Sequence, residues 1–268
     1  MRPCPRTCRG VPTELHGTKI CARKRHYTPR QAASLAIAWI CLLGLGLPSC
    51  MTMLEIERKY QTPPDLQERV LRQGGTKIET KAFTDVYYDK GCLLGRNNCW
   101  LRRRDSTFEL KVPCQQVPLP EAPDSHSQSS SFQEINDTTA IAAALRKIAP
   151  DFLPPAETAD SDAFHEALMA QDFRPYAKFA TNRSTFEIEG VSIASDVADF
   201  GHSVTEVEVL LQDTSDSISL AEADIKVENV AHSLGLEPLP GDQGGKLHEY
   251  LREYNPEYQQ ELREAGVI

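Results

Sequence analysis

The sequence predicts an α+β protein in which eight strands form an antiparallel sheet or a closed β-barrel, with helices around it. Two observations favour this class. Strand-forming segments follow one another in hairpin-like succession, and no glycine-rich phosphate loop joins a strand to a helix. The strands are expected at residues 54–61, 82–89, 98–104, 107–113, 132–136, 176–189, 191–196 and 203–212.

Turn and helix signals fill the intervals between these strands. Asp105-Ser106 and Glu189-Gly190 are short connections typical of hairpins. Asp137 is a predicted helix N-cap, and Gly235 is a predicted residue just after a helix end. Apolar residues at helical spacing predict helices over 64–73, 138–148, 161–171 and 219–234, and one or two polar helices over 243–265, interrupted near Pro256.

The composition is that of an ordinary globular protein, with 40% hydrophobic and 25% charged residues. One domain over residues 53–268 is the simplest organisation. Within it, the stretch 115–131 is rich in Pro, Ser and Gln, which predicts a flexible surface loop. The net charge of −9 argues against a general nucleic-acid binder.

Residues 1–50 differ in character from the rest of the chain. They hold 8 basic residues and 1 acidic residue, and the remainder carries a net charge of −16. The uncharged run from Ala32 to Leu47 falls short of the roughly 17–25 residues that span a bilayer, and better suits a signal-type apolar region. Two interpretations stay open. We favour an optional extension, with synthesis starting at Met51 or Met53, over a targeting or anchoring segment. We therefore expect a cytoplasmic protein, at a membrane only if the extension is retained.

Cysteine usage favours a reducing compartment. Of the eight cysteines, only Cys92, Cys99 and Cys114 lie outside the first fifty residues, and none of the three shows Cys-x-x-Cys spacing. This pattern argues against both a disulfide framework and a zinc site. We expect buried or half-buried thiols.

Charged and apolar residues alternate in the first predicted strand. Successive side chains of a strand point to opposite faces, so Glu55, Glu57 and Lys59 share one face. Two carboxylates and an ammonium group could hold a hard metal ion beside a phosphate. They could equally be the solvated face of an amphipathic strand, which is the commoner outcome for a single strand.

Three more strands repeat this alternation. The residues that share a face are Trp100 with Arg102 and Arg104, Glu109 with Lys111, and Glu206 with Glu208, and Arg183, Asp196 and Lys246 add isolated charges. Apolar residues on the opposite faces could contact an outer layer of helices. Buried charges need partners, which a metal ion and a phosphate chain would supply. A polar interior and a polar outer surface both stay open on this evidence.

Ordered motifs across residues 54–252 carry a resemblance to a known family. They are Glu55-Ile56-Glu57-Arg58-Lys59, Thr84–Asp89, Trp100–Arg104, Glu109–Lys111, Asn182–Ser184, Asp199–Gly201, Glu206–Glu208 and Lys246-Leu247. The first is similar to the Glu-x-Glu-x-Lys signature of the CYTH superfamily, the triphosphate tunnel metalloenzymes. Within that superfamily the chain most resembles the animal-type thiamine triphosphatases.

The resemblance implies an eight-stranded antiparallel barrel that forms an open-ended tunnel with its charged residues inside. It implies that one or two Mg²⁺ ions bind to carboxylates, the ligands that a small hard cation prefers. The implied metal ligands are Glu55, Glu57, Asp196, Glu206 and Glu208. The implied substrate contacts are Lys59, Trp100, Arg102, Arg104, Lys111, Arg183 and Lys246, and the residues closest to the chemistry are Lys59, Arg102, Arg104, Glu206 and Glu208.

The implied activity is hydrolysis of thiamine triphosphate to thiamine diphosphate and phosphate. Trp100 takes the place of an aromatic side chain that would stack on the thiamine rings, although it could simply be a wall residue of the barrel. The alternatives are an inorganic triphosphatase, a nucleoside triphosphatase, or a non-catalytic polyphosphate-binding protein. We expect a monomer whose partner is a small-molecule triphosphate, with no nucleic acid involved.

Overall fold

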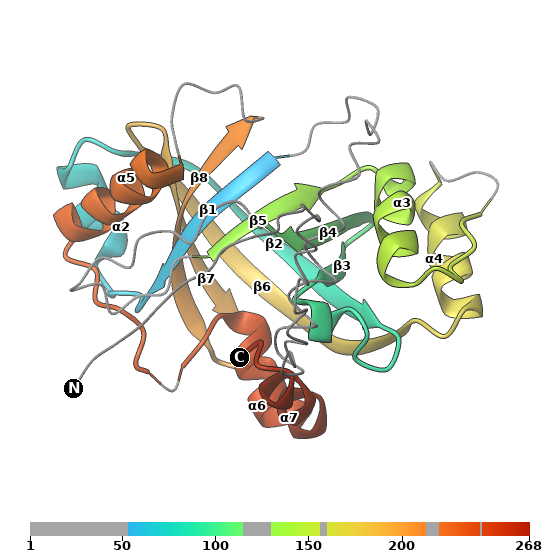
Figure 1. Ribbon diagram of the computed structural model, residues 1–268. Coiled ribbons are helices and arrows are strands. Elements are labelled where there is room, and N and C mark those ends of the chain that lie inside the picture. Colours follow the sequence, from blue (N-terminus) through green and yellow to red (C-terminus); the bar gives the residue numbers. More distant parts are fainter. Residues whose placement is uncertain (1–52, 115–129, 156–159, 213–219, 242) are drawn as a thin grey trace, which may run out of the picture.

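The strands close into one antiparallel barrel, in the order β1-β5-β4-β3-β2-β6-β7-β8 (Figure 1). The computed structural model describes residues 53–114, 130–155, 160–212, 220–241 and 243–268. The closed barrel confirms the predicted fold class and decides between the two expected arrangements. The strands are β1 Met53–Tyr60, β2 Thr76–Asp89, β3 Trp100–Arg104, β4 Thr107–Pro113, β5 Ser130–Ile135, β6 Arg174–Ile188, β7 Val191–Ala198 and β8 Ser203–Gln212.

The helices lie outside the barrel, with α2 and α5 on one side, α3 and α4 on the opposite side, and α6 and α7 together at a third place (Figure 1). The Asp137 carboxylate caps α3 as predicted, because it accepts from the Ala140 N–H at 2.8 Å. Asn255 separates the last two helices, just before Pro256. The bounds are α2 Leu66–Arg72, η1 Gly95–Asn97, α3 Thr138–Ile148, α4 Ser161–Ala170, α5 Leu220–Ser233, α6 Lys246–Tyr254 and α7 Pro256–Glu264.

Some strand boundaries differ from the prediction. β2 begins at Thr76 rather than at residue 82. Residues 76–82 pair with β6, but they are exposed and lack the apolar alternation by which a strand is predicted. β3 begins two residues later than expected, since Asn98 takes a left-handed conformation with φ of 54°. Ser130 and Ser131 belong to β5 rather than to the predicted loop. The rest of that loop, 115–129, and the extension 1–50 lie outside the described residues.

The outward faces of the strands carry the hydrophobic core. Ile56 and Val207 are completely buried in a cluster that β1, β6, β7 and β8 form with α2 and α5. Leu101 and Leu110 are completely buried in a second cluster, where β3, β4 and β5 meet α3 and α4. Apolar burial is the main favourable term in folding, so helix packing fixes each strand with this face outward. The alternate face, with its charges, is thereby directed into the barrel.

Cys92 and Cys99 are buried and Cys114 is half-buried, each as a free thiol, which confirms the expectation for the three. Within the described part of the chain, no helix combines the length and the hydropathy that a membrane span requires.

Candidate active site

The barrel encloses a cavity of about 300 Å³. All the site residues predicted from the sequence line it except Asp196, so strands far apart in the chain bring their charged faces together as the polar-interior interpretation required. The cavity-lining members of that set are Glu55, Glu57, Lys59, Trp100, Arg102, Arg104, Lys111, Arg183, Glu206, Glu208 and Lys246. The volume lies at the lower end of the usual range for small-molecule sites.

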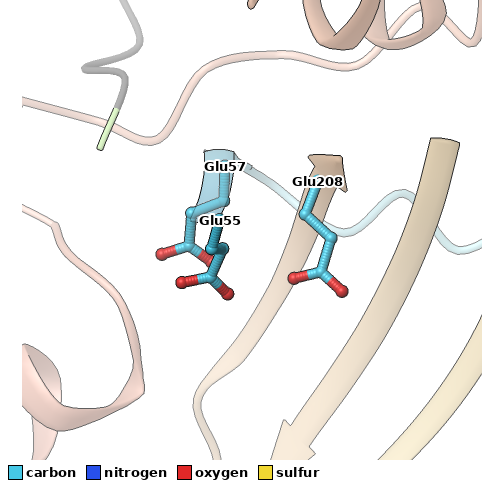
Figure 2. A group of neighbouring side chains, drawn as sticks. All are labelled: Glu55, Glu57 and Glu208. Atoms are coloured by element: carbon cyan, nitrogen blue, oxygen red, sulfur yellow. The ribbon is translucent and has the colours of Figure 1, made fainter. Parts of the chain in front are cut away.

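Three carboxylates from two neighbouring strands form an acidic group (Figure 2). Glu57 of β1 lies opposite Glu208 of β8 in the strand register, and Glu55 lies two residues earlier on β1. Each offers one oxygen, and these oxygens all lie within 4.8 Å of one another. Three convergent carboxylates are a donor set that suits a hard divalent cation such as Mg²⁺, so the residues present fit the implied metal.

Burial and mutual repulsion govern the acidic group. Burial, together with the Glu57 charge, raises the pKa of Glu55 to about 9. The same two causes raise the pKa of Glu208. Burial also acts to raise the pKa of Glu57, but the Lys59 and Lys111 ammonium groups outweigh it and lower this pKa. The negative charge of the acidic group therefore exceeds the positive charge of the neighbouring cations. A bound dication would relieve this repulsion.

A carboxylate of β2 orients one arginine of β3 and lies near a second. Asp85 is completely buried and accepts two hydrogen bonds from Arg104, at 2.8 and 2.9 Å. Arg102 lies 3.9 Å from the same carboxylate and 2.6 Å from Glu109. Although burial opposes it, the pairing with Arg104 and Arg102 lowers the pKa of Asp85. Arg102 Nε is a buried donor with no hydrogen-bond partner among the described residues.

The charges that look isolated in the sequence form a second network. Arg183 donates to Asp196 at 2.7 and 2.6 Å and to Glu206 at 2.5 Å. Lys246 contacts both carboxylates, at 2.7 Å from Glu206. Burial opposes ionisation of Glu206, but Lys246, Arg183 and Lys59 hold its pKa well below the usual range.

Asp196 is the predicted site residue that does not line the cavity. It pairs instead with Arg183, which does. Both of its oxygens accept hydrogen bonds from cations, and neither it nor Glu206 belongs to the three-carboxylate group. Direct metal ligation by these two residues therefore stays a prediction.

The structure adds site residues that sequence reasoning did not select. Glu109 and Glu134 line the cavity, and Glu134 lies 3.0 Å from Lys111, which also contacts Glu55. The alternation already placed Glu109 on the charged face with Lys111, although Glu109 was not among the predicted site residues. Asp85 likewise shares a face with Tyr87, another wall residue. The predicted strand that contains Glu134 gave no comparable signal, because it lacks a clear polar alternation.

One part of the cavity wall is apolar and comes from the chain's C-terminal helices. Trp100 and Leu247 of α6 both pack there against the buried cluster that contains Leu251 of α6 and Leu262 of α7. The Trp100 indole N–H donates to the Asn98 side-chain oxygen at 3.0 Å, which fixes the ring in the wall. The cavity therefore offers charged walls and an apolar aromatic surface to the same ligand.

A closed antiparallel barrel whose interior sets a carboxylate group beside a cluster of arginines and lysines defines the class of triphosphate tunnel hydrolases. Comparison with known proteins agrees with that class. The model of the CYTH domain matches residues 53–239. The chain belongs to the CYTH family.

Curated relatives are more specific in name. The chain is 31% identical over 226 residues to a thiamine-triphosphatase of Macaca fascicularis, covering 80% of this chain and 91% of that protein. It is 30% identical to a thiamine-triphosphatase of Homo sapiens, with the same coverage. A solved structure from Pyrococcus horikoshii OT3 shares 20% identity, with a TM-score of 0.45, covering 69% of this chain and 92% of that one.

Proposed function

We propose that this protein is a Mg²⁺-dependent hydrolase that releases the terminal phosphate of thiamine triphosphate, leaving thiamine diphosphate. The observation that supports it most is the division of one cavity into a carboxylate group, an Arg/Lys set and an apolar aromatic wall. A triphosphate bearing an organic ring system has the matching parts. The two relatives named above add support for the same substrate.

The basic residues would bind the phosphate chain. Arginine suits this role because its planar fork donates to two phosphate oxygens at once, and Asp85 already holds Arg104 in a fixed orientation. Lys59, Lys111 and Lys246 would act as point charges. In the transition state, charge spreads over the oxygens of the transferred phosphoryl group, so cations fixed beside them lower the barrier.

Glu55, Glu57 and Glu208 would hold the metal. When bound there, Mg²⁺ would neutralise phosphate charge and polarise the terminal phosphorus. Glu206, also a predicted metal ligand, would in addition orient two cations. Its bonds to Arg183 and Lys246 keep both cations aimed at the cavity, and its lowered pKa keeps it ionised while it does so. Water attack on the terminal phosphorus then releases inorganic phosphate.

An inorganic triphosphatase or a nucleoside triphosphatase is the second candidate, because the charged walls would bind any triphosphate. Trp100 is the feature that favours the thiamine compound. Its ring face can attract the cationic thiazolium group and pack against its apolar edges. Inorganic triphosphate would leave this surface unused.

The deciding experiment compares three substrates with the purified full-length chain and Mg²⁺. We expect kcat/KM for thiamine triphosphate to exceed that for tripolyphosphate and ATP by at least about tenfold, the scale of discrimination that an apolar pocket provides. Equal or inverted ratios would contradict the thiamine assignment and leave a broader triphosphatase. Failure to release phosphate from any of the three would contradict hydrolysis itself. Omission of Mg²⁺ is the control.

A further inference from the structure

The turn that delivers Lys246 to the cavity depends on very close packing. Lys246 is the first residue of α6, and Gly244 and Gly245 precede it. A Cβ on Gly245 would lie 2.7 Å from Lys59 Cε, and a Cβ on Gly244 would lie 2.0 Å from His248 Nδ1. A Cβ at either position would have to displace the neighbouring side chain of Lys59 or His248. The turn thus packs against one cation of the cavity, Lys59, and directly precedes another, Lys246.

Glu249, one turn into α6, is bonded to this turn. Its carboxylate accepts a hydrogen bond from the Gly244 N–H at 2.8 Å and also pairs with Arg252. The residue is only 5% exposed and is not part of the cavity wall. The bond to the Gly244 N–H ties the start of α6 to the turn that precedes it.

We propose that Glu249 is a positioning residue for phosphate binding, which fixes the Gly244-Gly245 turn and through it the ammonium group of Lys246. The inference rests on the proposed function in that Lys246 binds the phosphate chain. Glu249 lies beyond the 53–239 region that the CYTH model matches, so family membership does not assign it this role.

The chemistry of the bond explains why a carboxylate stands here. A backbone N–H bonded to an ionised oxygen makes a shorter and stronger contact than a neutral pair makes. A negative charge in the first turn also interacts favourably with the positive end of the helix dipole. Glutamine retains an acceptor oxygen at the same place, whereas valine leaves the Gly244 N–H without this partner.

The test measures binding of tripolyphosphate by calorimetry, alongside hydrolysis rates and melting temperatures. Glu249→Val should weaken binding by about 10- to 150-fold, the usual value of a hydrogen bond to a charged group. Glu249→Gln should weaken binding by only about fivefold, because glutamine retains the acceptor oxygen but not the charge. Glu253→Val is the matched control, because Glu253 is an exposed residue of the same helix, and it should bind as wild type does.

A double-mutant cycle separates positioning from a general structural role. If Glu249 acts through Lys246, Glu249→Val should cost no further affinity once Lys246→Met has been introduced. The same loss in both backgrounds, or wild-type affinity of Glu249→Val, would overturn the proposal. Should Glu249→Val fail to fold, Glu249→Gln takes its place in the cycle: its smaller loss of affinity should disappear in the Lys246→Met background, and an equal loss in both backgrounds would overturn the proposal.

The outcomes also distinguish this inference from the proposed function. If wild-type protein binds tripolyphosphate more tightly than Glu249→Val does, yet hydrolyses no triphosphate, the hydrolase proposal is refuted and the positioning role is supported. Wild-type protein that does not bind tripolyphosphate would overturn both.

Discussion

Replacement of Asp85 by Asn should show that a buried carboxylate that orients an arginine contributes more to stability than a surface ion pair does. Asp85 is completely buried and makes two hydrogen bonds to Arg104, whose side chain is 22% exposed. Breaking a buried ion pair by removing one partner costs about 3–5 kcal/mol. Because Arg104 reaches solvent and Asn retains one acceptor, we expect the lower end, about 3 kcal/mol in the free energy of unfolding.

The pH dependence gives this prediction its sign. The arginines lower the pKa of Asp85 in the folded protein, so its stabilising contribution is present above the ordinary carboxyl pKa and is lost as the pH falls through the folded-state value. The difference between wild type and Asp85→Asn should therefore be greatest near pH 7. It should shrink when the pH falls below about 4.

The assay is urea unfolding of both proteins at pH 7 and at acid pH, and the chain offers a matched control. Arg103, between the two arginines in sequence, points outward and pairs with Asp162 at 2.6 Å, but the Asp162 side chain is 81% exposed. Asp162→Asn should cost under about 1 kcal/mol. Equal costs for the two substitutions, or a cost of Asp85→Asn that does not depend on pH, would refute the reasoning.

Three further predictions concern the aromatic wall, the metal group and the fold. Trp100→Ala should lower kcat/KM for thiamine triphosphate by about tenfold and leave tripolyphosphate nearly unchanged; equal losses in parallel assays would make Trp100 only a wall residue. Glu208→Gln should raise the Mg²⁺ concentration for half-maximal activity by at least about tenfold, because ligand charge sets affinity, whereas the exposed control Glu166→Gln should not. Asp137→Ala should lower the free energy of unfolding by about 1 kcal/mol in urea, through loss of the α3 cap, with KM unchanged; a changed KM would count against a purely structural role.

The strands with strict alternation were predictable from the sequence for a physical reason. In β1, β3 and β8 the period of two separates an apolar face from a charged face that carries Glu57 or Arg102, and packing of the apolar face against the helices places the charged face inside. The N-terminal half of β2 was missed because it is exposed and held mainly by backbone pairing with β6. Pairing of that kind leaves no hydrophobic pattern.

The partners of individual charges could not be predicted in the same way. Arg183 and Asp196 meet because β6 and β7 pair in a register that places them directly opposite, and a single strand does not reveal the register. Lys246 joins them from a helix about fifty residues further along the chain. Asp85 was overlooked as a site residue because its role depends on Arg104, its partner across the β2–β3 ladder.

The central claim is that the barrel cavity is the site of triphosphate hydrolysis. Its most direct test is the rate of phosphate release by Glu206→Gln. The variant keeps the size of the side chain but removes the charge that holds Arg183 and Lys246. With Mg²⁺ and saturating thiamine triphosphate, kcat should fall by at least about 100-fold, the scale for loss of transition-state charge stabilisation, while circular dichroism shows an intact fold. Wild-type turnover by this variant would contradict hydrolysis in this cavity.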